Sequence, residues 1–216
     1  MTRIAENEAA GRRTYWDEYY AARADVRRPL PSQFATFVAN ELTEPTRIVE
    51  FGCGTGRDSV FFALYGHDVV GVDGSEQAVK ASQALADALG LPARFLAANV
   101  DDADLADRVG PARGRSLVYA RFFVHAITDE EEERFLEAAA RVATPGDMLA
   151  VEYRTVRDSS GAKVTERHYR RFVTPATFDA RALSKGFDAV YNVEGFGFAK
   201  YKQDDAYVAR ALFVKR

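Results

Sequence analysis

The sequence of 216 residues predicts an α/β fold in which a mostly parallel sheet, covered by helices on both faces, ends in an antiparallel pair of strands. Strand-like and helix-like runs alternate over 47–154 with short connections, which is the pattern of βαβ units in a parallel sheet. The last two strand-like runs, 187–198 and 206–214, are joined by a loop alone, so we expect them to pair antiparallel.

The elements follow one another in a regular order. A helix over 6–24 carries clustered aromatic side chains, and Ser32 is placed to cap a second helix over 33–42. Thr128 opens a long helix, and Pro175 stands at the first position of the last helix, where a missing N–H leaves no hydrogen bond unmade. The other strands are expected over 47–51, 67–73, 93–100, 116–122 and 147–154, and the other helices over 57–65 and 75–90.

Composition and charge restrict the class of protein. The chain is 47% apolar and 28% charged with a net charge of -3, and a chain of this size buries about 70% of its surface, which suits a single domain over 1–216. No apolar run approaches the roughly 20 residues that span a bilayer, the charged N-terminus lacks a signal-peptide core, and the single cysteine cannot form an internal disulfide. We therefore expect a cytoplasmic monomer or homodimer that binds neither membrane nor nucleic acid.

A glycine-rich turn follows a buried strand and is the most informative segment. Gly52, Gly54 and Gly56 stand at every second position before a helix, where glycine permits positive φ and close approach of a ligand to the backbone. A phosphate-binding P-loop would need a lysine after the last glycine, and a dinucleotide-binding turn would need its third glycine at Arg57. The spacing therefore excludes the first motif and disfavours the second.

Polar residues end the next two strands at the same edge. Asp73 ends the strand after the turn, where an acidic side chain in an open α/β sheet binds the two hydroxyls of a ribose. The alternative is that Asp73 only caps the following helix, but Ser75 can do so itself. Asn99 lies at the end of the third strand, and ligands gather at this carboxyl edge.

The run from Glu50 to Gly56, followed by Asp73, resembles class I S-adenosylmethionine-dependent methyltransferases of the small-molecule type. The resemblance covers residues 30–154. It implies a Rossmann-like seven-stranded methyltransferase sheet, mostly parallel with an antiparallel last strand. It also implies S-adenosyl-L-methionine as cofactor and S-adenosyl-L-homocysteine as product. Two positions depart from the family. Asn99 stands where many relatives carry Asp, and Ser116 begins the fourth strand, where relatives often carry Asp.

The resemblance implies cofactor-binding roles by position. The turn and Glu50 would hold the methionine end, Asp73 would hold the ribose, and the adenine would lie between 74–75 and 99–100. Related small-molecule enzymes often cover the cofactor with an N-terminal helix, so we expect 1–30 to form a lid, although such a helix could simply pack on the domain. The expected cofactor-binding residues are Tyr15, Trp16, Tyr19, Glu50, Gly52, Gly54, Gly56, Asp73, Gly74, Ser75, Asn99 and Val100.

The family places acceptor-facing groups at the end of the fourth strand, although Tyr119 there could instead pack in the core. His125 is the candidate catalytic base, or else a histidine that is hydrogen-bonded within its loop. Arg121 could bind a substrate anion or pair with Glu152 at the end of the fifth strand. A basic insertion over 155–173 suggests an anion-binding lid, or else a solvated segment. The expected substrate-binding residues are Tyr119, Arg121, Arg167, Arg170 and Arg171.

The acidic run over 129–133 does not indicate a metal site. It follows Thr128 at the start of a helix, where carboxylates favour the helix dipole and Glu131 can complete a capping box. Because no His/Cys cluster has metal-ligand spacing, we expect no metal.

These patterns predict methyl transfer from S-adenosyl-L-methionine to an oxygen or nitrogen acceptor on a small, polar or anionic metabolite. The protein would mainly align donor and acceptor, and it would need a base only for a protonated acceptor. The short chain carries no further recognition domain, which argues against a macromolecular substrate. Two alternatives stay open: another chemistry with the same cofactor, such as cyclisation, and a non-catalytic cofactor-binding partner protein.

Overall fold

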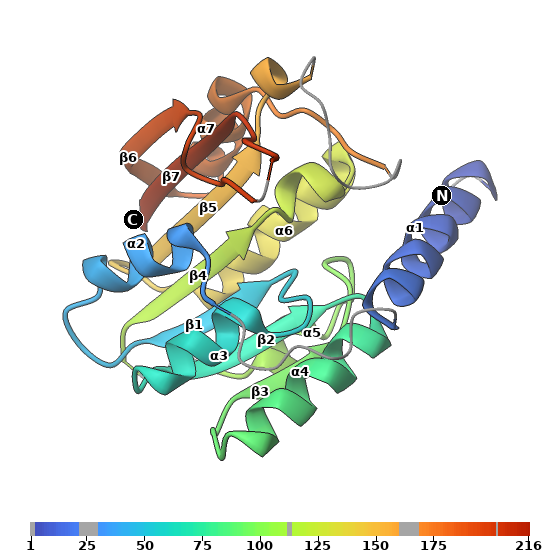
Figure 1. Cartoon of the computed structure of the whole chain (residues 1–216). Coiled ribbons are helices and arrows are strands. Elements are labelled where there is room, and N and C mark those ends of the chain that lie inside the picture. The colour runs from blue at the N-terminus through green and yellow to red at the C-terminus, as the bar shows by residue number, and fades with distance from the viewer. Residues whose placement is uncertain (1–2, 22–29, 112–113, 160–168, 202) are drawn as a thin grey trace.

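The computed structural model describes residues 3–21, 30–111, 114–159, 169–201 and 203–216. Within these ranges the strands are β1 (Arg47–Phe51), β2 (Asp68–Asp73), β3 (Arg94–Ala97), β4 (Ser116–Arg121), β5 (Met148–Arg154), β6 (Phe187–Gly195) and β7 (Val208–Lys215). They form one sheet in the order β3-β2-β1-β4-β5-β7-β6 (Figure 1). Neighbouring strands pair parallel except β7, which runs antiparallel to β5 and β6. This topology confirms the predicted fold class.

Helices connect the strands at positions close to those predicted. The helices of the described residues are α1 (Arg3–Ala21), α2 (Gln33–Glu41), α3 (Arg57–Leu64), α4 (Glu76–Ala88), α5 (Leu105–Val109), α6 (Asp129–Val142) and α7 (Pro175–Ser184), with short 3-10 helices η1 (Val124–Ala126) and η2 (Val156–Asp158). Helix α5 was not predicted, because five residues are too few for an apolar period to be recognised.

Side-chain caps explain where two of the helices begin. The Ser32 hydroxyl accepts a hydrogen bond from the N–H of Ala35 at 2.9 Å, as predicted for the start of α2. Thr128 and Glu131 form the predicted capping box at the start of α6. Each cap satisfies backbone donors that would otherwise lack a partner in the first helical turn.

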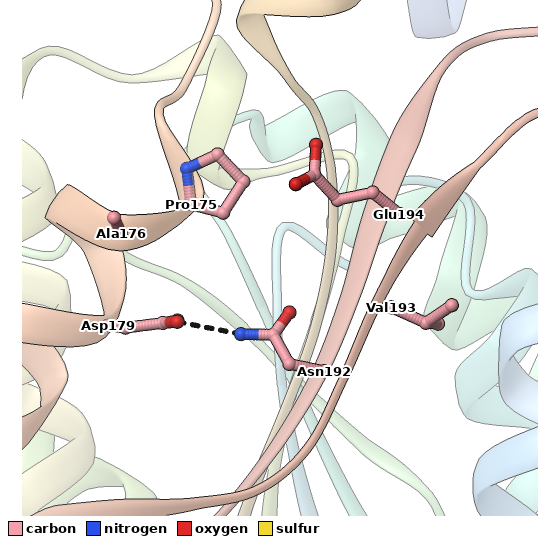
Figure 2. Close-up of a pocket in the computed structure, with 6 residues that line it drawn as sticks. All are labelled: Pro175, Ala176, Asp179, Asn192, Val193 and Glu194. Atoms are coloured by element: carbon pink, nitrogen blue, oxygen red, sulfur yellow. Dashed lines mark hydrogen bonds between the residues drawn. The ribbon is translucent and has the colours of Figure 1, made fainter.

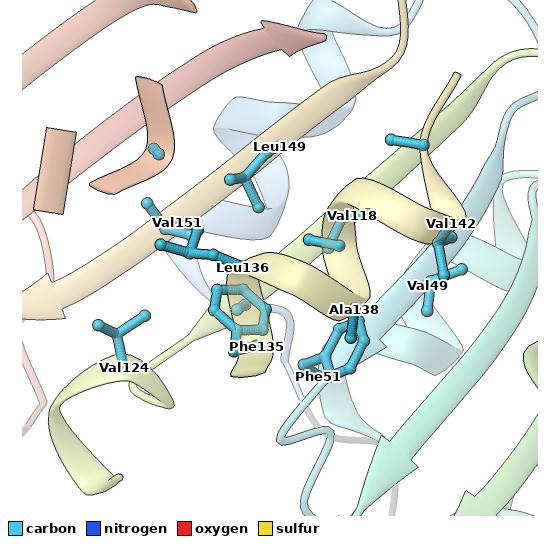
Figure 3. Packing of buried hydrophobic residues seen from close by; sticks show 14 of the residues in the cluster. Val49, Phe51, Val118, Val124, Phe135, Leu136, Ala138, Val142, Leu149 and Val151 are labelled. Atoms are coloured by element: carbon cyan, nitrogen blue, oxygen red, sulfur yellow. The ribbon is translucent and has the colours of Figure 1, made fainter. Parts of the chain in front are cut away.

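Buried side chains point alternately to the two faces of the central strands. On one face α5, α6 and α7 pack, and Figure 3 shows Phe135 and Leu136 of α6 near Val118 and Val151 of the sheet. On the other face α2, α3 and α4 pack around a cluster that includes Phe62. A parallel sheet that is covered on both faces leaves its edge at the carboxyl ends of the strands for ligands.

Helix α1 stands apart from these two layers. It packs on α4 and lies across the edge of the sheet at which β1 and β4 end (Figure 1). No helix in the described ranges combines the length and apolar character needed to cross a membrane.

Candidate functional site

The glycine-rich turn after β1 has the backbone conformation that its composition permits. Gly52, Gly54 and Gly56 have φ values of 69°, 55° and 77°, which are left-handed and strained for residues with a side chain. The N–H groups of Gly52 and Cys53 donate to the carbonyl oxygen of Val72 at 2.8 and 3.1 Å. The turn is therefore fixed to the end of β2 and leads directly into the N-terminus of α3.

Asp73 brackets this turn from the end of β2. Its Oδ2 accepts the N–H of Gly54 and its Oδ1 accepts the N–H of Ser75, both at 2.9 Å. Burial raises the pKa of Asp73, although the two backbone donors oppose this effect. A carboxylate can accept about four hydrogen bonds, so Asp73 can still accept from further donors such as two neighbouring hydroxyls.

The predicted adenine-binding segments lie against each other. A Cβ atom on Gly74 would lie 2.9 Å from Oδ1 of Asn99, so the loops after β2 and β3 are in contact. Ser75 is buried and caps α4 by accepting the N–H of Ala78 at 3.2 Å. Val100 packs against the hydrophobic core on the α6 face. The structure thus brings Asp73 and the two predicted adenine-binding segments together at one edge.

Glu50 lies beneath the turn. Its side chain is only 3% exposed, and it accepts the hydroxyl of Ser59 at 2.5 Å. Burial and the nearby carboxylate of Asp58 raise the pKa of Glu50. This position favours a role in supporting the turn over direct contact with a ligand.

Helix α1 lies directly over the turn. A Cβ atom on Gly54 would lie 2.8 Å from the hydroxyl of Tyr20. Three residues earlier on α1, Asp17 accepts the hydroxyl of Ser75 at 2.5 Å, which holds α1 to the start of α4. Tyr20 of α1 therefore reaches the glycine turn, although it was not among the residues that the sequence predicts to bind the cofactor.

The three aromatic residues selected from the sequence form a cluster with Tyr20. Trp16 packs edge-on against Tyr15 and Tyr19, with ring centroids 5.1 and 5.4 Å apart, and stacks on Tyr20 at 5.8 Å. At the other side of α1, Arg12 pairs with a glutamate of α6 at 2.5 Å. Helix α1 therefore bridges α4 and α6.

Tyr119 lies in the core. Its side chain is fully buried, its ring stacks on Phe34 at 5.2 Å, and its hydroxyl donates to Asp58 at 2.9 Å. Burial and the charge of Asp58 raise the pKa of Tyr119 well above its usual value. These contacts favour the core interpretation of Tyr119 over the substrate-binding one.

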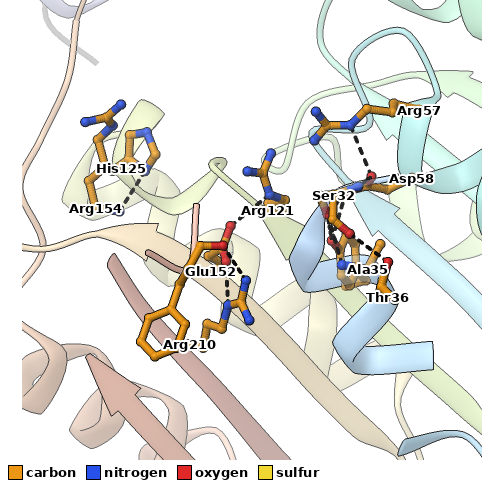
Figure 4. A network of polar contacts seen from close by, with 12 residues as sticks. Ser32, Ala35, Thr36, Arg57, Asp58, Arg121, His125, Glu152, Arg154 and Arg210 are labelled. Atoms are coloured by element: carbon orange, nitrogen blue, oxygen red, sulfur yellow. Dashed lines mark hydrogen bonds and ion pairs between the residues drawn. The ribbon is translucent and has the colours of Figure 1, made fainter. Parts of the chain in front are cut away.

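His125 is held between β5 and the segment before α7. Its ring is buried, and its Nδ1 accepts the N–H of Arg154 at 3.2 Å (Figure 4). A neutral imidazole that accepts at Nδ1 carries its proton on Nε2, so neither nitrogen is placed to take a proton from a substrate. The carbonyl oxygen of His125 also accepts the N–H of Arg171 at 2.8 Å. The geometry favours the loop-histidine interpretation over that of a catalytic base.

Arg171 of the basic insertion is already paired with carboxylates of the protein. Arg171 pairs with Asp129 at 2.5 Å and with Glu132, so its guanidinium group is directed into α6. Burial lowers the pKa of Arg170. Arg167 lies outside the described residues. The pairing of the basic insertion with the acidic run was not predicted, because the two segments are distant in sequence.

The acidic run is neutralised by arginines rather than arranged around an ion. Asp129 also pairs with Arg181 at 2.8 Å, and the hydrogen bond from Arg181 lowers the pKa of Asp129. Among the residues that the structure describes, no group of three or more His, Cys, Asp and Glu side chains could hold a metal ion.

A buried carboxylate joins the ends of three neighbouring strands. Glu152 is fully buried and accepts Nε of Arg121 at 2.8 Å and Nε of Arg210 at 2.7 Å (Figure 4). The Arg121 guanidinium lies 4.3 Å from the ring centroid of Phe122, whose φ of 56° is unusual for a bulky residue. The Arg121–Glu152 pair, given above as the alternative to an anion-binding role for Arg121, is formed. Arg210 was missed, because the sequence does not reveal that β7 lies beside β5.

A separate hollow of about 300 Å³ lies between α7 and β6 (Figure 2). It is lined by Pro175, Ala176, Asp179, Asn192, Val193 and Glu194. The amide of Asn192 donates to Asp179 at 2.7 Å across this hollow. None of the residues predicted to bind cofactor or substrate lines it, so it is distinct from the site at the glycine turn.

Sequence comparisons point to the same site. A family model described as a methyltransferase domain matches residues 48–146, which include the glycine turn and Asp73. A ubiquinone biosynthesis O-methyltransferase of Caulobacter sp. (strain K31) is 30% identical over 144 residues. That alignment covers 66% of this chain and 55% of the relative, so the chain spans little more than half the length of this curated protein.

Solved structures share the fold over most of the chain. The CcbJ methyltransferase from Streptomyces caelestis has a TM-score of 0.71 at 18% identity, over 94% of this chain and 98% of that chain. A structure described by the conversion of a disulfide bond into a thioacetal group during echinomycin biosynthesis has a TM-score of 0.73 at 18% identity. The match covers 94% of this chain and 92% of that chain. The cyclase SpnF has a TM-score of 0.67 at 16% identity, over 84% of this chain and 79% of that chain.

At these identities the structural likeness establishes the fold alone. Residues 48–146, which include the glycine turn and Asp73, are similar to a methyltransferase domain, and the chain shares the fold of S-adenosylmethionine-dependent methyltransferases.

Proposed function

We propose that this protein transfers a methyl group from S-adenosyl-L-methionine to an oxygen or nitrogen atom of a small, polar or anionic acceptor. The observation that carries the proposal is that the carboxylate of Asp73 accepts hydrogen bonds from the backbone N–H groups of Gly54 and Ser75. It places a carboxylate and a glycine backbone at one edge of the sheet, which suits the ribose hydroxyls and the methionine end of this cofactor. The O-methyltransferase relative supports the same chemistry.

The reaction requires alignment more than acid–base chemistry from the protein. The bound cofactor supplies a methyl group on a positively charged sulfur, which is already a good leaving group. An acceptor that is already deprotonated at neutral pH, such as a carboxylate, needs no base, whereas an alcohol or an ammonium group has to lose a proton and does need one. Because the Nδ1 atom of His125 already accepts a backbone hydrogen bond, an anionic oxygen or an unprotonated nitrogen suits this site best.

Calorimetry and label transfer test the proposal. We expect S-adenosyl-L-homocysteine to bind well below millimolar concentration. We also expect methyl label from S-adenosyl-L-methionine to enter at least one compound of a panel of small carboxylates, phenols and amines. A protein that does not bind the product would contradict the proposal. Binding without transfer to any of these compounds would favour the alternatives, a cyclase-like reaction or a non-catalytic cofactor-binding protein.

Replacement of Tyr20 by alanine tests the lid. Tyr20 lies on Gly54 and has to move before a ligand can reach that backbone. We therefore expect Tyr20→Ala to make both the association and the dissociation of S-adenosyl-L-homocysteine faster. The single tryptophan of the chain, Trp16, stacks on Tyr20, so stopped-flow fluorescence can follow both rates.

Tyr65→Ala is the control, because it removes an exposed tyrosine at the end of α3. It should leave both rates unchanged. Equal rates in Tyr20→Ala and in the unmodified protein would show that α1 does not cover the site.

A further inference from the structure

Two arginines flank Asp58 at the edge of the sheet next to the glycine turn. Arg57, the first residue of α3, donates from Nε to Asp58 at 3.2 Å. Arg121, the last residue of β4, donates from Nε to Glu152 at 2.8 Å. Because each guanidinium group is held by its Nε atom on a buried carboxylate, the direction of its two terminal nitrogens is fixed.

The terminal nitrogens of both arginines make no hydrogen bond with any of the described residues. In the part of the chain that the structure describes, Arg57 and Arg121 form their hydrogen bonds through Nε alone. Their side chains are 36% and 15% exposed, so both reach solvent. In Figure 4 both guanidinium groups lie on the same side of the polar network. Each could still donate two hydrogen bonds to a ligand.

Several arginines gather around two buried carboxylates. Three guanidinium groups, those of Arg57, Arg121 and Arg210, share the carboxylates of Asp58 and Glu152. Burial acts to raise the pKa of Asp58, but Arg57 and Arg121 outweigh it and the pKa is lowered, so both arginines act on this one carboxylate. A further carboxylate could accept charge-assisted hydrogen bonds from the terminal nitrogens of Arg57 and Arg121.

We propose that Arg57 and Arg121 form a seat for a carboxylate of the methyl acceptor. This inference rests on the proposed function and names the charge of its second substrate. Strand β1 lies between β2 and β4, so Arg121 at the end of β4 lies on the opposite side of β1 from Asp73 at the end of β2. A ribose held by Asp73 and a carboxylate held by the two arginines would therefore occupy different places at this edge, so that cofactor and acceptor can bind together, as transfer between them requires.

The test measures binding of small carboxylates to the protein with and without S-adenosyl-L-homocysteine, by calorimetry and ligand-observed NMR. The probes are malonate, benzoate and protocatechuate, with the neutral amide of protocatechuate for comparison. We expect at least one carboxylate to bind and the amide to bind more weakly. Arg57→Met and Arg121→Lys should each weaken carboxylate binding by about tenfold or more, since the first removes a charged donor and the second removes the guanidinium fork that can hold a carboxylate with two hydrogen bonds.

Arg121→Lys keeps a positive charge beside Glu152, so that carboxylate is not left unpaired. The variant therefore tests whether carboxylate binding needs the planar guanidinium group of Arg121. Arg134→Met, which removes an exposed arginine of α6, is the matched control and should change nothing. Thermal unfolding of each variant checks that the fold is kept.

Three results would overturn this inference: no carboxylate binds, carboxylate binding is unchanged in both variants, or the variants weaken product binding itself. In the last case methylthioadenosine, which lacks the carboxylate of the product, would bind the variants normally, and the arginines would serve the cofactor. Failure of the proposed function looks different. There the unmodified protein would not bind S-adenosyl-L-homocysteine at all, while the carboxylate titration without product would still report on the seat.

Discussion

Asp73→Ala should weaken the binding of S-adenosyl-L-homocysteine by roughly a hundredfold, because hydrogen bonds from two hydroxyls to a charged acceptor are lost. The carboxylate also holds the N–H groups of Gly54 and Ser75, so the turn itself should loosen. Calorimetry at neutral pH measures the affinity. The affinity of the unmodified protein should fall as the pH is lowered and Asp73 becomes protonated. Since burial raises the pKa of Asp73, this fall should begin at a higher pH than for an aspartate with an ordinary pKa.

The control for this variant is Asp68→Ala. Asp68 is exposed at the opposite end of the same strand and should leave the affinity unchanged. The pH dependence should also be absent from Asp73→Ala, because the group that loses its charge is gone. An Asp73→Ala protein that binds the product as tightly as the unmodified protein would remove the ribose-binding role.

Glu152→Gln should lower the free energy of unfolding by about 3–5 kcal/mol, because it leaves two largely buried guanidinium groups without their counter-ion. Glu152 is fully buried and pairs with Arg121 at 2.8 Å and with Arg210 at 2.7 Å. For a chain of this length that loss corresponds to a fall in Tm of about 10 °C. Denaturant titration and calorimetric scans measure the two quantities.

Glu44→Gln is the matched control, because Glu44 pairs with Arg115 at 3.8 Å and both side chains are more than half exposed. Exposed pairs of this kind contribute about 0–1 kcal/mol, so the change should be small. If Glu152→Gln were as stable as Glu44→Gln, the buried network would not be what joins the ends of β4, β5 and β7.

Much of the fold was predictable because the signals are local. The run 47–51 and its glycine turn occur where predicted, and so does the capping box of Thr128 and Glu131. Each depends on neighbours within a few residues. The order of the last strands was less accessible, because the sequence predicts that β6 and β7 pair but not that β7 inserts beside β5.

The two halves of the candidate site differ in the same way. The cofactor half was predictable because Gly54 and Asp73 stand at the ends of adjacent strands, which the βαβ pattern already brings together. The acceptor half was not. His125 and Arg171 are suitable by residue type, yet the structure gives the first a backbone hydrogen bond and the second two carboxylates of α6.

By itself the sequence determined the fold class, the glycine turn and the acidic residue that faces it, because spacing along one chain decides these features. Only the tertiary structure decided that Tyr20 covers the turn, and that Arg57 and Arg121 keep their terminal nitrogens available while Arg171 does not. The physical reason is that an arginine's role depends on which carboxylates lie within about 4 Å of it. For Arg121 and Arg171 those carboxylates come from elements far away in the sequence.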